Sequence, residues 1–570
     1  MKNSSFFERS ELTRALWAFR REFYVVGVFS MVANVLLLAP TLYMLQVYDR
    51  VLVSRSELTL LALSLITLFL FLVGSFSEWM RSRVLVRTGM KLDEALSTRI
   101  FHASFESNLK KFGTGTSKAF GDLVQLRQFL TGNGIFALFD APWALVYLVV
   151  VFFLHPILGF LALIFAALQA ALAWFGHRRA VVPAQKAQNA ASDETQDLQL
   201  KLLQVETLEP MGMVHTMGNE WQAKHHGVMA QQAESQSLNH KMTAWSKFLR
   251  YSQQSLALGA GALLVIDGQL SPGAMIAANV LMTRTLTPID MLVGTWRSFV
   301  MAQASFKRLE ALLESHPEDE RNVSRTPPTG AIEINNLFAR AEGRVEPILK
   351  NVNFRAQPGS VTVVLGPSGS GKSTLVRCMI GVWPNFSGEV LLDARPITGW
   401  DRNDLGCYLG YLPQDIELFE GSIAENISRF TEINSEKVIE AAQSAGLHEM
   451  ILRFSKGYDT SIGEAGGLLS GGQRQRIGLA RAIYGNPKLI VLDEPNANLD
   501  DVGEAALIKA VQILKSQGST VVLVTHRPSI LAVADRVVVL KNGSIQADGP
   551  RDVVLEKLRS AQQSLSLSVI

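Results

Sequence analysis

A glycine-rich segment in the second half of the chain constrains the fold most, because an apolar stretch typical of a β-strand precedes it and a helix is expected after it. The apolar stretch covers residues 361–365, and the helix is expected to begin at Thr374. Between them the sequence reads Gly366, Pro367, Ser368, Gly369, Ser370, Gly371, Lys372, Ser373 and Thr374. Glycines let successive backbone N–H groups point at phosphate oxygens, Lys372 can reach the β- and γ-phosphates, and the Ser373 hydroxyl can ligate Mg²⁺. This segment predicts a phosphate-binding loop in an α/β domain, and a glycine-rich turn without a ligand is the alternative.

A second apolar run supplies two carboxylates. Residues 489–492 predict a buried parallel strand, and Asp493 and Glu494 follow at its carboxyl end. Ligands bind at that edge of such sheets. Asp493 suits the Mg²⁺ shell and Glu494 can polarise an attacking water, since phosphoryl transfer needs positioning and charge neutralisation. The alternative is an acidic helix N-cap without catalytic function.

Between these motifs, residues 469–476 read Leu-Ser-Gly-Gly-Gln-Arg-Gln-Arg. This run resembles the signature of ABC ATPases, in which the serine and glycines close on a nucleotide held by a partner subunit. The resemblance implies that ATP is the nucleotide and that Ser470, Gly471, Gly472 and Gln473 contact it. One chain carries one such ATPase, so the expected working unit is a homodimer with two composite sites.

The same family resemblance extends to four further positions. Gln414 resembles the glutamine that contacts Mg²⁺ and couples to the membrane domain, and Asp500 resembles the aspartate of the D-loop. His526 follows the apolar run 521–524 and resembles the histidine that senses the γ-phosphate. Arg340 stands roughly where family members have an aromatic residue that stacks on adenine. An arginine can stack on a base through cation–π attraction, which keeps Arg340 a candidate adenine contact.

The first half of the chain has the composition of a membrane domain. Hydrophobic residues make up 48% of the 570 residues, and the mean hydropathy of +0.18 is high for a chain with a charged ATPase surface. About 20 mostly apolar residues span the hydrocarbon. Six stretches qualify: 23–47, 58–78, 133–154, 157–175, 249–267 and 273–296. We therefore predict a cytoplasmic segment 1–22, an α-helical six-span exporter domain 23–313, a linker 314–330 and an α/β P-loop ABC ATPase domain 331–570.

Basic residues predict the orientation of these spans. Five Lys or Arg residues precede the first span, and nine lie between the second and third, whereas 155–156 and 267–272 contain none. Short basic loops stay cytoplasmic, so the ATPase domain should face the cytoplasm. The first apolar run is too long for a signal-peptide core and is expected to be retained. We therefore interpret the basic residues as determinants of membrane topology. The sequence has no basic groove pattern interleaved with aromatic residues, so we expect membrane lipids but no nucleic acid as partners.

Long amphipathic stretches join the second to the third span and the fourth to the fifth. They cover about 79–132 and 176–248 and are expected to extend the spans into the cytoplasm. Bends near 113–121 and 211–218 are candidate contacts with the ATPases, and plain surface turns are the alternative. The two cysteines, Cys378 and Cys407, are expected to be small buried residues of the ATPase domain.

A narrower resemblance covers nearly the whole chain. It rests on residues 121–132, on Phe-Asp-Ala-Pro-Trp at 139–143, on 155–159, on 211–213 and on the asparagine-containing segment 493–500. Together these are similar to the PrtD/HasD-type permease-ATPases of bacterial type I secretion systems. That resemblance implies an inner-membrane exporter of unfolded proteins with an uncleaved C-terminal signal, such as a metalloprotease, a lipase or a haem-binding protein. It also implies a periplasmic adaptor (membrane fusion protein) and a TolC-like outer-membrane channel as partners.

Two other functions remain open at this stage. A lipid or drug exporter shares the ATPase motifs and the six spans, whereas a scaffold that binds ATP without hydrolysis would tend to lack Glu494 or the signature. Only 22 residues precede the first predicted span, so no leader-peptidase activity is expected. Polar residues inside spans are costly and are candidates for a polypeptide path or for pairing within the membrane. They are Asp140, Gln253, Gln254, Asn279 and Arg284.

Overall fold

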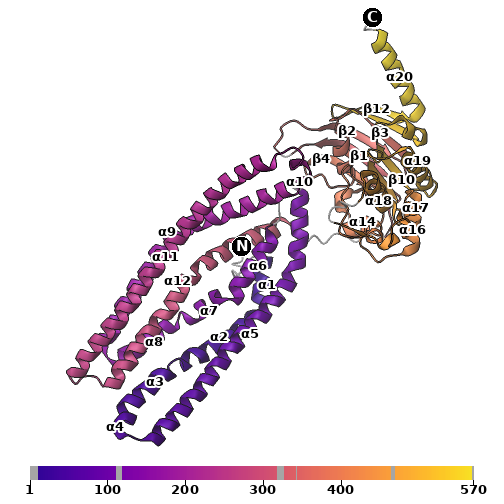
Figure 1. Ribbon diagram of the computed structural model, residues 1–570. Coiled ribbons are helices and arrows are strands. Elements are labelled where there is room, and N and C mark those ends of the chain that lie inside the picture. Colours follow the sequence, from indigo (N-terminus) through magenta and orange to yellow (C-terminus); the bar gives the residue numbers. More distant parts are fainter. Residues whose placement is uncertain (1–9, 111–117, 318–325, 342, 464–468, 568–570) are drawn as a thin grey trace, which may run out of the picture. The chain divides into compact units, whose positions relative to one another are not determined.

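A computed structural model describes residues 10–110, 118–317, 326–341, 343–463 and 469–567. The chain divides into two compact units, residues 1–106 with 116–317 and residues 107–115 with 318–570 (Figure 1). The first unit is built from helices, and the second contains the β-sheets.

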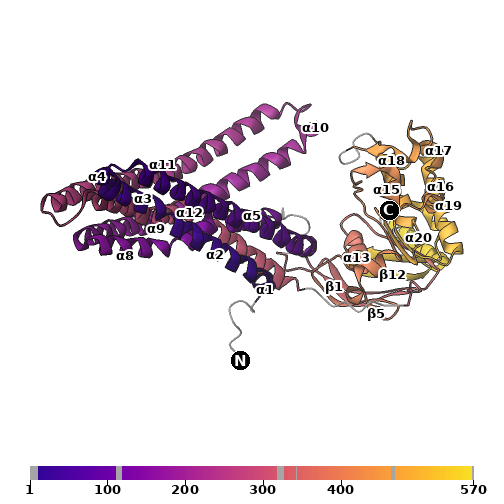
Figure 2. The same ribbon diagram turned by 90° about the horizontal axis from the view of Figure 1, so that it is seen from below.

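Long helices dominate the first unit, and α9 and α11 lie side by side over much of their length (Figures 1 and 2). Its elements are α1 (Glu11–Ala18), α2 (Arg20–Leu36), α3 (Ala39–Gln46), the π-helix η2 (Val47–Val51), α4 (Leu52–Ser54), α5 (Glu57–Lys110), α6 (Ala119–Thr131), α7 (Asn133–Asp140), α8 (Trp143–Leu154), α9 (Pro156–Leu202), α10 (Val205–Leu208), α11 (Val214–Ile266) and α12 (Pro272–Ser315). α5 has 54 residues, or about 80 Å of helix, which is far more than a bilayer requires.

Four helical segments among the described residues are long and apolar enough to cross a membrane. They are 20–54, 57–109, 133–154 and 156–202. In α5 only 6% of the most apolar window is buried within the protein, and side chains such as Leu58 and Phe69 are more than 60% exposed. Lipid is the solvent that such a surface fits. The fifth and sixth predicted spans lie in the less apolar helices α11 and α12, so the count of six remains a prediction.

The amphipathic stretches continue the apolar helices, as predicted. α5 runs on to Lys110, and α9 and α11 extend past their apolar parts to a short connection that contains α10 (Figure 2). The predicted bend at 211–218 falls on the turn after α10 and the first turn of α11. Of the bend at 113–121, residues 113–117 lie outside the described residues, and the rest forms the start of α6.

Polar side chains in the helical unit are paired with one another. Asp140, which is 7% exposed, accepts hydrogen bonds from Arg81 Nη1 at 3.1 Å and from Asn34 Nδ2 at 2.7 Å. The hydroxyl of Tyr147 donates to the Asn34 carbonyl at 2.9 Å. This cluster joins α2, α5, α7 and α8 and compensates the cost of burying a carboxylate.

Gln253, a candidate for a polypeptide path or for pairing within the membrane, is paired in the structure. Gln253 is 1% exposed, and its Nε2 donates to the carbonyl oxygen of Met282 at 3.0 Å. It therefore links α11 to α12. Gln254 is exposed, and Asn279 and Arg284 are half-buried.

The connection between α11 and α12 is held by a carboxylate from η2. Asp49 Oδ1 accepts a hydrogen bond from the Gly273 N–H at 2.8 Å, and its Oδ2 accepts one from Ser271 Oγ at 2.5 Å. A Cβ on Gly273 would lie within 2.8 Å of the Asp49 carboxyl group, so a larger residue there would displace this carboxylate. The negative charge also favours the N-terminus of α12.

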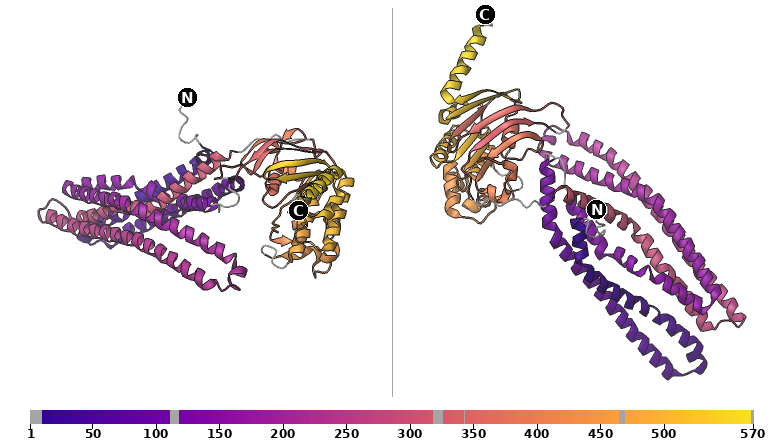
Figure 3. Two further views of the ribbon diagram at one scale, coloured as in Figure 1. Left: turned by 90° about the horizontal axis from the view of Figure 1, so that it is seen from above. Right: turned by 180° about the vertical axis from the view of Figure 1, so that it is seen from behind.

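The second unit contains a six-stranded sheet of order β12-β11-β3-β10-β9-β6, a four-stranded antiparallel sheet of order β2-β1-β4-β5 and a short β7-β8 pair. The strands are β1 (Ile332–Ala339), β2 (Leu349–Ala356), β3 (Val361–Leu365), β4 (Phe386–Leu392), β5 (Arg395–Pro396), β6 (Leu409–Leu412), β7 (Gly421–Ser422), β8 (Ser461–Ile462), β9 (Leu489–Asp493), β10 (Thr520–Val524), β11 (Arg536–Lys541) and β12 (Ser544–Pro550). The helices are α13 (Lys372–Met379), α14 (Arg402–Gly406), α15 (Ile423–Ile427), α16 (Ser435–Ser444), α17 (His448–Ile451), α18 (Gly471–Ile483), α19 (Asp501–Ser516) and α20 (Arg551–Leu567), with 3-10 turns η3 (Ile397–Gly399), η4 (Gly457–Asp459) and η6 (Pro528–Val533). Figure 3 shows the same elements from above and behind.

Consecutive residues of the central strands point into two different cores. Val521 and Leu523 of β10 pack in the core that contains α18 and α19, whereas Val522 and Val524 pack in the core that contains α13 and the antiparallel sheet. This alternation is the period of a strand, and a strand covered on both faces must be apolar throughout. Cys378 is buried as expected, but Cys407 is exposed, so the expectation for the second cysteine is wrong.

Arg429 has a structural role that the sequence did not indicate. Its guanidinium donates to the carbonyl oxygens of Arg481 at 2.9 Å, Ala482 at 3.0 Å and Leu409 at 3.1 Å, and to that of Gly406 at 2.5 Å. Through Arg429, which follows α15, these bonds join α18 to the end of α14 and the start of β6. Burial lowers the pKa of Arg429, since the charged form loses solvation.

We predict that Arg429→Met destabilises the ATPase unit. The substitution leaves several carbonyl oxygens without their donor, which costs about 1–3 kcal/mol for each buried group that finds no water. The expected result is a lower Tm of the full chain in thermal unfolding followed by circular dichroism. Arg453→Met, on an exposed position, is the control. An unchanged Tm for Arg429→Met would contradict this role.

Candidate functional site

The phosphate-binding loop has the predicted position between β3 and α13. α13 begins at Lys372, two residues earlier than expected from the sequence. Gly371 has a φ of +99°, and a Cβ there would lie 2.8 Å from Leu349 Cδ2. A Cβ on Gly366 would lie 2.2 Å from the carbonyl oxygen of Leu540. The fold therefore requires glycine at these two positions, and the N-terminal amides of α13 line the loop.

The Lys372 side chain is held over the loop by carbonyl oxygens of the loop backbone. Its Nζ donates to the carbonyl oxygens of Gly366 and Pro367, each at 3.0 Å, and the residue is only 8% exposed. The Ser370 hydroxyl is buried beside it and makes no hydrogen bond with the described residues. A buried ammonium group and an unsatisfied hydroxyl in one loop fit phosphate oxygens as their ligands.

Asp493 and Ser373 meet below this loop. The Ser373 hydroxyl is hydrogen-bonded to Asp493, and burial raises the pKa of that carboxyl group, with Glu494 adding to the shift. Asp493 is 1% exposed, and its Oδ1 accepts no hydrogen bond from the described residues. A hydroxyl beside a buried carboxylate oxygen is a donor set that fits Mg²⁺, which binds through one or two carboxylates and keeps several waters.

Parallel strands bring the other predicted catalytic residues to the same edge. Asp493 pairs with Val524 of β10, and Val524 pairs with Val364 of β3. On the far side of β9, Leu492 pairs with Leu412 of β6. The segments after β3, β10, β9 and β6 therefore lie next to one another, and they carry Lys372, His526, Glu494 and Gln414. The carboxyl edge of such a sheet is where ligands bind.

Glu494 has an unusual backbone conformation. Its φ is +48°, in the left-handed region that a residue with a side chain rarely adopts. Its N–H donates to the Val524 carbonyl at 2.9 Å, and its carboxylate accepts a hydrogen bond from Gln414 Nε2 at 3.4 Å. Strained backbone of this kind occurs preferentially at functional sites. The structure thus brings together the predicted base and the predicted Q-loop residue.

His526 follows β10 and is exposed. The residues on either side of it are fixed. The hydroxyl of Thr525, which is fully buried, donates to Asn496 Oδ1 at 3.0 Å, and Arg527 pairs with Glu504 of α19 at 2.6 Å. The backbone that carries His526 is therefore anchored, whereas its imidazole faces solvent.

The signature residues cap α18. Ser470 Oγ accepts from the Gln473 N–H at 3.3 Å, and Gln473 Oε1 accepts from the Ser470 N–H at 2.9 Å. This capping box satisfies two free amides at the start of the helix. A Cβ on Gly472 would lie 2.8 Å from the Asn498 carbonyl oxygen, and Gly471 lies next to the same residue. Hence the signature and the D-loop pack against each other within one chain.

Asp500 caps α19 and also bridges to α18. Its Oδ1 accepts a hydrogen bond from the Gly503 N–H at 2.8 Å and one from Arg476 Nη2 at 2.6 Å. The backbone bond from Gly503 lowers the pKa of Asp500, and Arg476 lowers it further. Within the chain Asp500 therefore fixes the geometry of the D-loop. Its predicted nucleotide contact remains a prediction.

Arg340 lies directly after β1 with an exposed side chain. Its N–H donates to the Asn385 carbonyl at 3.0 Å, and its carbonyl accepts from Trp383 Nε1 at 3.1 Å. The backbone at this position is fixed while the guanidinium can move, which leaves the adenine contact a prediction.

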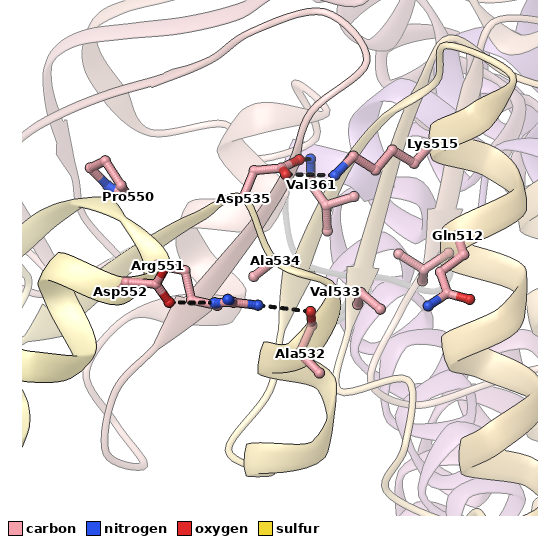
Figure 4. A pocket seen from close by; sticks show the side chains of 11 residues that line it. Val361, Gln512, Lys515, Ala532, Val533, Ala534, Asp535, Pro550, Arg551 and Asp552 are labelled. Atoms are coloured by element: carbon pink, nitrogen blue, oxygen red, sulfur yellow. Dashed lines mark hydrogen bonds and ion pairs between the residues drawn. The ribbon is translucent and has the colours of Figure 1, made fainter.

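A cleft of about 430 Å³ lies elsewhere in this unit (Figure 4). It is lined by Val361 at the start of β3, by residues 532–535 and by the beginning of α20. The phosphate loop follows the opposite end of β3. The charged groups at the cleft are paired, Lys515 with Asp535 at 2.5 Å and Arg551 with Asp552 at 2.9 Å. The cleft is therefore separate from the nucleotide site.

Sequence reasoning missed Gln475, Asn496, Asn498 and Thr525. Gln475 Nε2 donates to the Glu494 carbonyl at 3.3 Å, and Asn498 Nδ2 donates to Gln475 Oε1 at 3.4 Å. The two asparagines entered the sequence analysis only as part of the segment 493–500 that carries the narrower family resemblance. Only their burial beside the end of β9 or β10 identifies these side chains, and burial cannot be read from the sequence.

The phosphate loop, the two carboxylates and the signature define an ATPase, and comparisons with known families agree. Residues 349–497 match a family model described as ABC transporter, and residues 23–289 match one described as ABC transporter transmembrane region. The chain belongs to the ABC transporters. It is accordingly a multi-pass membrane protein that binds ATP and has an ATPase domain.

Among individual proteins, the chain is similar to type I secretion proteins. It is 40% identical to the type I secretion system ATP-binding protein PrsD of Rhizobium meliloti, over 95% of this chain and 94% of that protein. It is 30% identical to the alpha-hemolysin translocation ATP-binding protein HlyB of Escherichia coli, over 96% of this chain and 78% of that protein. It is 29% identical to the toxin RTX-I translocation ATP-binding protein of Actinobacillus pleuropneumoniae, over 95% of this chain and 77% of that protein.

A solved structure confirms the fold. A bacterial Atm1-family ABC exporter with ATP bound superposes with a TM-score of 0.81 at 21% identity, over 95% of this chain and 96% of that one. The predicted fold class, a helical exporter domain fused to an α/β P-loop ABC domain, is therefore correct. At this identity the likeness concerns the fold alone.

Proposed function

We propose that this protein is an ATP-driven exporter of unfolded proteins that carry an uncleaved C-terminal secretion signal. The proposal is supported by the position of Lys372, Asp493, Glu494 and His526 in segments that follow neighbouring strands at one sheet edge. It is also supported by the similarity of nearly the whole chain to type I secretion ATP-binding proteins. An ATP-binding scaffold without turnover is disfavoured, because the strained Glu494 and the capped signature are both present.

Two chains form the working unit in this proposal. Lys372 and the amides of α13 bind the phosphates in one chain, while Ser470, Gly471 and Gly472 of the second chain close on the same nucleotide. Gln414 and Glu494 orient the attacking water, and Glu494 accepts its proton. His526 contacts the γ-phosphate. Bound at Ser373, Asp493 and Gln414, Mg²⁺ would neutralise charge on the phosphates during transfer.

The connection between α9 and α11 is the proposed contact that transmits ATPase movement to the membrane helices. Leu202, Leu203, Val205 and Met211 are each 49% exposed or more. Apolar side chains gathered at the end of two long helices need a partner surface in an aqueous compartment. We assign that surface to an ATPase domain of the dimer.

The proposed location is the bacterial inner membrane, with six spans per chain and the ATPase domain in the cytoplasm. A periplasmic adaptor and a TolC-like outer-membrane channel complete the path of the exported protein across both membranes. Metalloproteases, lipases and haem-binding proteins that end in such a signal are the proposed substrate class.

A secretion assay tests this function. The chain is expressed with an adaptor and an outer channel of type I systems, together with a reporter that ends in a C-terminal type I signal. We expect the reporter in the medium with the wild-type chain and not with Glu494→Gln. A reporter without the signal is the matched control.

The outcomes separate the two export functions. A reporter that remains inside while purified chain hydrolyses ATP, across signals from several substrates, would overturn protein export. Stimulation of that ATPase activity by lipids or amphiphiles, rather than by a signal-bearing protein, would then support the lipid or drug exporter.

A further inference from the structure

Gln475 links the signature run 469–476, to which it belongs, with the carboxyl end of β9 and with the D-loop. It lies in the second turn of α18, two residues after Gln473, and is 1% exposed. Its Nε2 donates to the carbonyl oxygen of Glu494, and its Oε1 accepts from Asn498 Nδ2. Asn498 in turn packs against Gly471 and Gly472. A buried amide in this position must satisfy both ends, and it does so with the catalytic strand end and the D-loop.

The hydrogen bond from Gln475 is made to the backbone of Glu494, which has an unfavourable conformation. With a φ of +48° the residue needs external support for its backbone. The Glu494 N–H is held by Val524, and its carbonyl accepts from the Ala497 N–H at 3.1 Å as well as from Gln475. The orientation of the peptide after Glu494 decides where the carboxylate points, since the side chain leaves the same Cα.

We propose that Gln475 is a positioning residue for ATP hydrolysis, which holds the Glu494 backbone so that the carboxylate faces the attacking water. The inference rests on the proposed function, in which Glu494 is the base. In a dimer, the signature on α18 serves the partner's nucleotide while Glu494 serves the nucleotide of its own chain. Gln475 therefore connects the two composite sites through one chain.

Three substitutions in the full-length chain separate the two hydrogen bonds. Gln475→Met removes both and keeps the side-chain length. Gln475→Glu keeps an acceptor for Asn498 Nδ2 but, when ionised, has no donor for the Glu494 carbonyl. Asn498→Ala removes only the bond on the D-loop side. Gln443→Met, on an α16 position, is the matched control.

The expected results differ for kcat and KM. For Gln475→Met we expect kcat to fall at least tenfold with a KM for ATP within threefold of the wild-type value, because phosphate binding does not involve Gln475. Asn498→Ala should lower kcat less than Gln475→Met. Purified protein in phosphatidylglycerol-containing nanodiscs, with ATP as substrate and phosphate release as the readout, gives both constants.

The pH profile of Gln475→Glu tests positioning directly. A carboxyl group buried at this site titrates above its usual range, and its protonated form can donate to the Glu494 carbonyl. Among charged residues, Gln475 contacts the backbone of Glu494, and the adjacent Arg476 is paired with Asp500 at 2.6 Å. We expect the activity of Gln475→Glu relative to wild type to rise at least threefold from pH 8 to pH 6.

Three results would contradict the positioning role of Gln475 or the function on which it rests. A kcat within twofold of wild type for Gln475→Met would overturn the proposal. A large loss of kcat in both Gln475 variants with a lowered Tm and a flat relative pH profile would reduce Gln475 to a packing residue. If wild-type chain shows no ATP hydrolysis at all, the proposed function fails instead, independently of Gln475.

Discussion

Glu494→Gln should bind ATP and hydrolyse it about 10²–10⁴-fold more slowly than the wild-type chain, since a general base contributes that much to such a reaction. The amide keeps the size of the side chain and can still face Gln414, which lies 3.4 Å from the carboxylate. Phosphate release measures turnover, and filter binding of labelled ATP measures retention.

The closed dimer should accumulate in this variant, because ATP remains at the composite sites. Size-exclusion chromatography of the variant with ATP and Mg²⁺, followed by quantification of bound nucleotide, detects it. Glu436→Gln, on the exposed start of α16, is the matched control and should behave as wild type. Steady turnover near the wild-type rate in Glu494→Gln would remove Glu494 from the role of base.

Lys372→Ala should bind ATP much more weakly than the wild-type chain. The ammonium group is positioned at the loop by two carbonyl oxygens, and a charge-assisted bond to phosphate is worth about 1.5–3 kcal/mol. We therefore expect an ATP dissociation constant raised about 10- to 150-fold and no measurable hydrolysis. Fluorescent nucleotide titration of the purified chain measures the change.

Controls distinguish lost binding from lost structure. Lys350→Ala, at an exposed position of β2, should leave ATP affinity unchanged. The Tm of Lys372→Ala in the absence of nucleotide should stay close to that of wild type, because Gly366 and Pro367 are solvated once the side chain is gone. Wild-type ATP affinity in Lys372→Ala would contradict the phosphate-loop assignment.

These two variants also separate binding from chemistry. Glu494→Gln retains ATP and Lys372→Ala does not, so only the first should accumulate a nucleotide-bound dimer. Both residues were predicted from the sequence, since each follows an apolar strand at a position where a parallel sheet presents its carboxyl edge. The strand order then explains why segments more than 100 residues apart meet: β3, β10 and β9 are neighbours.

Other parts of the site could not be predicted, because burial and hydrogen bonding decide them. Nothing local marks Gln475 or Thr525 as buried, and the left-handed φ of Glu494 is imposed by contacts with β10 and α18. Cys407 is an example of the opposite error, since it was expected to be buried and is exposed. In the helical unit, the sequence left Gln253 as a candidate for a polypeptide path or for pairing, and the structure shows it bonded to the α12 backbone.

The sequence by itself determined the two kinds of domain, the phosphate loop, the carboxylates and the family, because apolar length, strand periodicity and motif spacing are local properties of the chain. Only the tertiary structure decided which polar groups pair. Asp140 meets Arg81 across 59 positions of sequence, and Arg429, which follows α15, donates to the carbonyl oxygens of Arg481 and Ala482. Such contacts follow from the packing of whole helices and strands, which fixes the distances between side chains that no local pattern relates.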